Sequence, residues 1–181
     1  RIGGDHDHAR PVAPVPVAFK SRLTPALETT PSEVACELKE LGDLELVLVT
    51  SRYARSAKLW RGLMAKYHYL GEPKACGAQL RYLLRCERFG ILGALSFRSG
   101  SLALKAREEW IGWSAKARRA NLALVVQNDR FLIVPSVKVP NLASHVLGKG
   151  LARLVLDWQD RYGVRPVLAE TFIDPDYAGT C

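Results

Sequence analysis

The stretch that decides the fold runs from Asn128 to Leu147 and reads Asn-Asp-Arg-Phe-Leu-Ile-Val-Pro-Ser-Val-Lys-Val-Pro-Asn-Leu-Ala-Ser-His-Val-Leu. The continuous apolar run over residues 131–134 is typical of a strand that is covered on both faces of a sheet. Two prolines bracket the exit from this strand, and Asn141 is a suitable N-cap for a helix. We therefore predict a buried central strand that leads through a turn into a helix, a junction at which α/β proteins often bind ligands.

A long helix and a further strand are predicted after this stretch. Beyond Asn141, apolar side chains recur every three or four residues, which predicts an amphipathic helix that ends at Gly163. Pro166 then opens a strand over residues 167–173. Because a crossover helix joins parallel strands, the sequence predicts a mixed α/β fold.

The clearest element before the central stretch is an antiparallel hairpin. Residues 79–86 alternate between apolar and polar side chains, as a half-buried strand does, and residues 91–97 form the return strand. The other predicted elements are a helix from the N-cap Thr30 to Leu41, a strand over 44–50, and helices over 54–68, 102–110 and 115–126, the last two separated by a break at Gly112. Residues 1–26 are predicted to be an extended leader, and residues 27–181 to form a single domain.

The positive charge is concentrated in the middle of the chain. The 181 residues include 26 Lys and Arg against 18 Asp and Glu, a net charge of +8. Residues 51–130 hold 16 of the basic and 5 of the acidic residues, and thus the whole excess. Such asymmetry is typical of a face that binds a polyanion, and a solvated basic surface is the alternative.

Membrane, secretory and metal-binding classes find no support in the sequence. No apolar run has the ~18–20 residues that a membrane span needs, and no apolar segment typical of a signal peptide is present. The four cysteines, at positions 36, 76, 86 and 181, form no Cys-x-x-Cys pair and have no histidine at a zinc-like spacing. We expect reduced thiols, with Cys86 in the core, in a cytoplasmic protein without a metal site or a membrane partner.

Four blocks of the chain, which together span about residues 55–181, resemble the DruA family of the Druantia anti-phage defence system. They are Tyr67-His68-Tyr69-Leu70-Gly71, Trp110-Ile111-Gly112-Trp113-Ser114, Asn128 through Ser144, and Asp157-Trp158 with Tyr162-Gly163, Pro166 through Asp174 and Gly179-Thr180-Cys181. The resemblance implies a prokaryotic protein of anti-phage defence, with other defence components or transposases as partners, because relatives occur beside or fused to transposases. Relatives also continue past the final Cys181, so we expect a C-terminally incomplete domain with its last strand near an exposed edge.

The order of the predicted elements also resembles the GNAT (acyl-CoA N-acyltransferase) fold. That resemblance implies a coenzyme A site in which a Gln/Arg-x-x-Gly-x-Gly/Ala turn holds the pyrophosphate at a helix N-terminus. The nearest match, at His145, Gly148 and Gly150, departs at its first position and lies a full turn inside the predicted helix, where the N–H groups are already bonded. We therefore expect no cofactor, with a coenzyme A thioester as the alternative.

Three residues are candidates for catalysis: Glu170, His68 and Asp174. Glu170 and Asp174 share one side of the predicted strand, but their carboxylates lie roughly 13 Å apart at ~3.3 Å per residue. This exceeds the ~5–9.5 Å of two-carboxylate hydrolases, so Glu170 alone is the candidate general base unless the strand bends. The alternative is a buried glutamate paired with an arginine, for which Arg130 is the expected partner.

The histidines have structural alternatives too. His68 lies between two tyrosines just past a predicted helix end, where it serves as a base, stacks on a nucleic-acid base or caps the helix. His145 lies between apolar neighbours and is expected to be a core histidine. No Ser-His-Asp order, phosphate-binding Gly-rich loop or His-Glu-x-x-His motif is present, so enzymatic activity stays open.

Basic residues interleaved with tryptophans suit a single-stranded or distorted nucleic acid. The alternative is a core tryptophan pair, Trp110 and Trp113, beneath a solvated basic face. The candidate nucleic-acid ligands are Arg107, Trp113, Lys116, Arg118, Arg119 and Arg130. Three hypotheses result: a DruA-like protein that contacts nucleic acid through residues 51–130, a coenzyme A-dependent N-acyltransferase, and a non-catalytic module of a larger assembly.

Overall fold

The computed structural model describes residues 30–51, 54–73 and 77–173. The predicted leader, Cys76, Asp174 and Cys181 lie outside these residues. The elements are β1 (Val34–Ala35), η2 (Leu38–Glu40), β2 (Leu44–Leu48), α1 (Arg55–Tyr67), β3 (Gln79–Cys86), β4 (Gly90–Ser99), α2 (Lys105–Ile111), α3 (Ala115–Asn121), η3 (Leu122–Leu124), β5 (Val125–Ile133), β6 (Val137–Lys138), α4 (Leu142–Tyr162) and β7 (Leu168–Thr171).

A five-stranded mixed sheet in the order β2-β3-β4-β5-β7 forms the frame of the molecule. The three pairs from β2 to β5 are antiparallel, and β7 pairs parallel with β5 after the α4 crossover. The predicted mixed α/β class is therefore confirmed, and the order of helix, hairpin, buried strand, crossover helix and parallel strand is the one expected of a GNAT-like fold. The centre of the sheet is β4 rather than the strand in the Asn128–Leu147 stretch, which lies between β4 and the edge strand β7.

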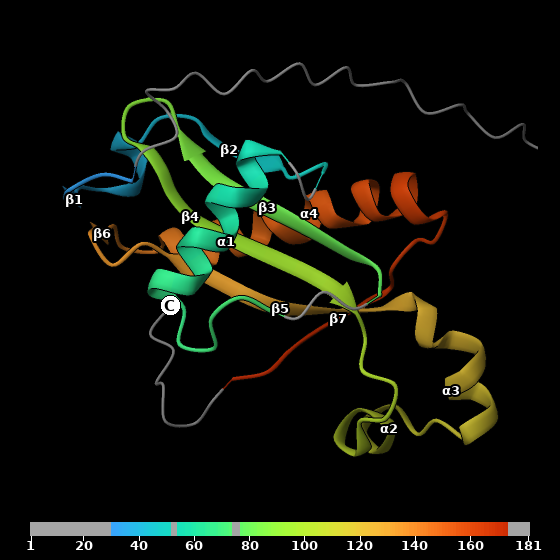
Figure 1. The fold of residues 1–181 in the computed structure, drawn as a ribbon. Coiled ribbons are helices and arrows are strands. Elements are labelled where there is room, and N and C mark those ends of the chain that lie inside the picture. The colour runs from blue at the N-terminus through green and yellow to red at the C-terminus, as the bar shows by residue number, and fades with distance from the viewer. Residues whose placement is uncertain (1–29, 52–53, 74–76, 174–181) are drawn as a thin grey trace, which may run out of the picture.

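Two helices cover opposite faces of this sheet (Figure 1). On one face, the Trp60 indole N–H of α1 donates to the Leu95 carbonyl of β4, 3.2 Å away. On the other face, the Tyr82 hydroxyl of β3 donates to the Asp157 carboxylate of α4 at 3.0 Å. Because side chains alternate along a strand, Tyr82 marks the α4 face of β3, and its odd-numbered neighbours lie on the α1 face.

The predicted hairpin and the helices on either side of the sheet are confirmed. β3 and β4 pair over their whole length with one bulge, and α1 has nearly the bounds predicted for it. Cys86 is fully buried, as expected, and its thiol donates to the Leu41 carbonyl. The break between the next two helices is also confirmed, since Gly112 has a left-handed φ of 75° that closes α2.

Helix α4 begins at Leu142 and ends before Gly163, close to the predicted bounds. Asn141 is the N-cap residue, as predicted, but it adopts a left-handed φ of 61° and its side chain makes no capping hydrogen bond. Gly150 faces the sheet, because a Cβ atom there would lie 2.8 Å from Leu95 Cδ1. The glycine thus lets the helix pack closely on β4.

The helix predicted between Thr30 and Leu41 is wrong. Val34 instead pairs in parallel with Val137, and the Ser136 hydroxyl donates to the Pro31 carbonyl at 2.8 Å. This pairing buries Val34 to 2% exposure, which the isolated helix would not achieve. The helix predicted over residues 115–126 also ends early, since β5 begins at Val125 in order to pair with both β4 and β7.

Candidate functional site

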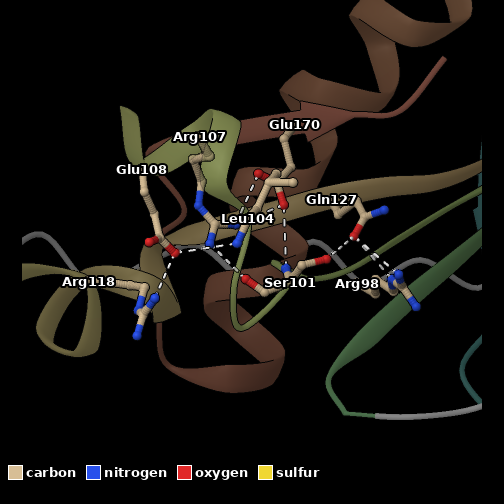
Figure 2. Close-up of polar contacts among 8 residues, drawn as sticks. All are labelled: Arg98, Ser101, Leu104, Arg107, Glu108, Arg118, Gln127 and Glu170. Atoms are coloured by element: carbon tan, nitrogen blue, oxygen red, sulfur yellow. Dashed lines mark hydrogen bonds and ion pairs between the residues drawn. The ribbon is translucent and has the colours of Figure 1, made fainter. Parts of the chain in front are cut away.

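Polar side chains cross the α1 face of the sheet in one transverse row. Gln79 of β3, Arg98 of β4, Gln127 of β5 and Glu170 of β7 are direct neighbours in the strand register. Gln127 is 3% exposed, yet it has partners, because its side-chain oxygen accepts from Arg98 and from the Ser101 hydroxyl at 3.3 Å each. Figure 2 shows the row continuing from Arg98 through Gln127 and Ser101 to Glu170. From Arg98 to Glu170 the row is therefore a connected network, as buried polar groups require.

Glu170 ends this row in an ion pair with Arg107 of α2. Arg107 Nη1 lies 3.1 Å from each oxygen of the carboxylate, and Nη2 donates to the Ser101 carbonyl at 2.7 Å. The two side chains are only 3% and 11% exposed. The predicted pairing of Glu170 with an arginine is confirmed, but the arginine is Arg107 and not Arg130. Arg107 was expected to contact nucleic acid, but its buried guanidinium is not accessible to such a ligand.

A second ion pair connects α2 with α3. Arg118 Nη1 lies 2.8 Å from Glu108 Oε1, and this hydrogen bond holds the pKa of Glu108 below its ordinary value. Ser114 caps α3, since its hydroxyl accepts from the Ala117 N–H. Residues 101–124, which we call the α2–α3 arm, project from one end of the sheet (Figure 1). The arm is thus a defined unit anchored by Arg107.

The arm exposes the remaining candidates for nucleic-acid contact. Lys116 and Arg119 are exposed, and within the described part of the chain neither has an ion-pair partner. Trp113 is half-buried and Trp110 is 79% exposed. The alternative of a core tryptophan pair is therefore wrong, because the arm lies beside the sheet and not over the core.

Arg130 and His68 form a separate cluster after α1. Arg130 Nε donates to the Gly71 carbonyl at 2.9 Å and Nη1 to the Asp129 carbonyl at 2.6 Å, so this guanidinium holds the loop that follows α1. His68 is the C-cap residue of α1, as one of its predicted roles required, and its Nδ1 accepts from the Leu70 N–H. Burial and, second, the charge of Arg130 lower the pKa of His68 from 6.5 to about 4. The imidazole is therefore neutral at neutral pH.

The residues of the coenzyme A alternative lie within α4. His145 donates its backbone N–H to the Asn141 carbonyl at 3.0 Å, and Gly148 and Gly150 follow inside the same helix. Their N–H groups are thus beyond the first turn, where the free donors of a helix are found. His145 is exposed, so its predicted place in the core is wrong.

Metal-binding clusters and membrane-spanning helices are both absent from the described ranges. No group of three or more His, Cys, Asp or Glu side chains there is arranged to hold a metal ion. No helix in the same ranges has the length and apolar character needed to cross a membrane.

Sequence reasoning did not identify two residues of the row, Arg98 and Gln127, or the neighbours that bond to the row, Arg81 and Ser101. The period-two pattern of residues 79–86 puts Gln79 and Arg81 on the polar side of the strand, and this is the signal in the sequence that points to the row. Gln127 follows the helix predicted over 115–126 and precedes the apolar run at 131–134, so the sequence does not reveal its position across from Arg98.

Comparison with known proteins identifies one family. The model of the family described as Druantia protein DruA matches residues 24–178 of the chain. No curated protein sequence matches significantly.

Two solved structures are similar in part. An aminoglycoside N-acetyltransferase, AAC(6')-Iy, in complex with CoA aligns with a TM-score of 0.43 and 14% identity, over 74% of this chain and 79% of that one. A ribosomal-protein-alanine N-acetyltransferase from Brucella melitensis biovar Abortus 2308 aligns with a TM-score of 0.40 and 14% identity, over 74% of this chain and 85% of that one. Similarity at this level carries no information about ligand or activity.

Proposed function

The chain belongs to the family of the Druantia protein DruA, and from this premise we propose that it acts in anti-phage defence or mobile-element biology by contacting nucleic acid through the α2–α3 arm. Other components of a defence system or a transposase are the protein partners that fit this proposal. The observation that supports it is the pairing of charges on the arm.

Every acidic side chain in the helices of the arm is neutralised by a neighbour, whereas two cations are not. Glu108 pairs with Arg118, and Glu109 lies 3.6 Å from Lys105. Lys116 and Arg119 then remain as the surplus charge on α3. A surplus of unpaired cations is what phosphate contacts require, because the attraction comes from the release of counterions.

The exposed indole of Trp110 gives the arm a second means of contact. The Trp110 ring is 79% exposed, so a ligand that covers it would remove apolar surface from water. Stacking of an unpaired base on such a ring contributes ~1–3 kcal/mol and tolerates any base sequence. The combination of cations and an indole favours single-stranded or distorted nucleic acid over intact duplex.

A salt titration of oligonucleotide binding tests the proposal. The variant Lys116→Ala/Arg119→Ala removes the two unpaired cations, and we expect the slope of log K against log salt to become less steep by about 1.4 for a single strand, or ~0.7 per contact. The matched control is Lys39→Ala/Arg88→Ala, which removes one exposed lysine and one exposed arginine at the other end of the sheet. Equal slopes for both variants and the wild type would refute the proposal.

A further inference from the structure

Two guanidinium groups on the α1 face of the sheet are held by glutamines instead of carboxylates. Arg81 Nε donates to Gln79 Oε1 at 3.1 Å, and the guanidinium carbon lies 4.7 Å from the centre of the Trp60 ring. Arg98 donates through both Nε and Nη2 to Gln127 Oε1. Over the described ranges, neither arginine lies within ion-pair distance of a carboxylate.

Two other arginines in contact with this sheet, Arg85 and Arg107, have carboxylate partners. Arg85, on the same face of β3, forms an ion pair with Glu45 of β2, and Arg107 forms one with Glu170. A carboxylate both orients and neutralises a guanidinium, whereas the neutral oxygen of a glutamine orients it and leaves the charge in place. The two central arginines are therefore positioned by neutral side chains. Glu72 and Asp129 favour the charged form of Arg81 from beyond ion-pair distance, and neither forms a direct pair with it.

The strand register places Arg81 and Arg98 close enough to act together. Gln79 lies opposite Arg98, and Arg81 lies opposite Ser96, so the two arginines are diagonal neighbours on one face. Diagonal positions on adjacent strands are about 7–8 Å apart, within reach of long side chains. Both arginines are half-buried, and burial, the largest influence, lowers the pKa of Arg81. A bound anion would stabilise both charges.

We propose that Arg81 and Arg98 form a phosphate-binding site on the α1 face of the sheet, which holds a backbone phosphate of a single nucleic-acid strand. A guanidinium fork matches the oxygens of a phosphate, and two of them form a clamp. The identity of the phosphate rests on the proposed function, since the network from Gln127 through Ser101 links this site to the base of the α2–α3 arm. In this proposal, a strand that stacks on Trp110 continues over the sheet to Arg98 and Arg81.

The site is tested with three variants of the full chain and a single-stranded 20-residue oligonucleotide, by fluorescence anisotropy. Arg98→Met and Arg81→Met keep the apolar stem and remove the charge, and we expect each to weaken binding about tenfold, as loss of a hydrogen bond to a charged group does. Gln127→Glu keeps both guanidinium groups and adds a carboxylate beside Arg98. We expect it to weaken binding about as much while the protein stays folded.

The control Arg88→Met removes an exposed arginine from the turn of the same hairpin, and we expect unchanged affinity. If Arg98→Met and Arg81→Met melt early, Gln127→Glu decides: wild-type affinity in that variant overturns the phosphate site. Loss of binding in Lys116→Ala/Arg119→Ala but not in the three sheet variants would also overturn it, and would leave the proposed function intact. Loss in the sheet variants alone would support the site and refute the role of the arm.

Discussion

Arg107 reaches both oxygens of the Glu170 carboxylate through a single nitrogen, at 3.1 Å to each, and uses its other terminal nitrogen for the Ser101 carbonyl. The Nε of Arg107 is buried and has no partner within the described part of the protein. The pair therefore joins α2 to the edge strand β7 through one side of the guanidinium. This makes Glu170 a structural partner of the arm before any chemical role is considered.

Replacement of Glu170 by alanine is expected to destabilise the fold by about 3–5 kcal/mol, because Arg107 would keep a buried charge without a counter-ion. Chemical denaturation measures the change. The double variant Arg107→Met/Glu170→Met is expected to cost much less than Glu170→Ala, since no charge is left buried. A double variant that is as unstable as Glu170→Ala would show that the ion pair is not what the single change disrupts.

The stability of the protein is expected to fall as the pH drops from 6.5 to about 4. The pKa of His68 is about 4 in the folded state and 6.5 ordinarily, so the unfolded state binds a proton in this window and the folded state does not. The contribution is fully present above pH 6.5. Melting temperatures of the wild type and of His68→Asn, whose amide oxygen also accepts from the Leu70 N–H, measure it. If the melting temperatures of the two proteins fell equally with pH, His68 would not be the cause of the loss of stability.

Two glycines of α4 are expected to respond in opposite ways to alanine. Gly148 has no atom within 4 Å of an added Cβ, so Gly148→Ala should raise the free energy of unfolding by about 0.5–1 kcal/mol. At Gly150 the added Cβ would overlap with the buried Leu95, and overpacking of this kind costs about 1–3 kcal/mol. Urea denaturation compares the two. Similar effects at both positions would show that Leu95 can move to accommodate a Cβ atom at position 150.

Truncation of Trp110 is expected to weaken nucleic-acid binding without a large change in the stability of the fold. Trp110→Ala should change the free energy of unfolding by less than about 0.5 kcal/mol, since the ring is 79% exposed, and should weaken single-strand binding by ~1–3 kcal/mol. Leu102→Ala, at a residue 80% exposed on the same arm, is the control for lost apolar surface without lost stacking. Equal effects of the two changes on affinity would argue against a stacked base.

The regular part of the fold was predictable because its signals are local. The period-two pattern of β3 and the three- and four-residue spacing in α4 require only neighbouring residues. The segment around Val34 has an equally good local signal, a helix N-terminus, but its partner lies 105 residues away, as the bond from Ser136 to Pro31 shows. A long-range strand pair outweighed the local preference there.

The sequence predicted some of the residues of the candidate site, but few of the contacts between them. Sequence reasoning identified Glu170 as one half of an ion pair with an arginine, and it placed Lys116 and Arg119 in the basic segment. It could not show that α2 folds back to bring Arg107 to Glu170, because this depends on tertiary packing. The same limit hid the row from Gln79 to Glu170, which requires the register of four strands.

The parallel pair of β1 and β6 also bears on the order in which the chain folds. Val34 pairs with residues that come just before α4, so its strand has no partner until the chain has closed a loop of about 100 residues. Closing a loop of this length is slow, because its entropy is lost before the contacts form. The strands of the β3–β4 hairpin are joined by a short turn, so their pairing closes only a short loop. We therefore expect protection from hydrogen exchange to appear first in the hairpin during refolding and last at Val34.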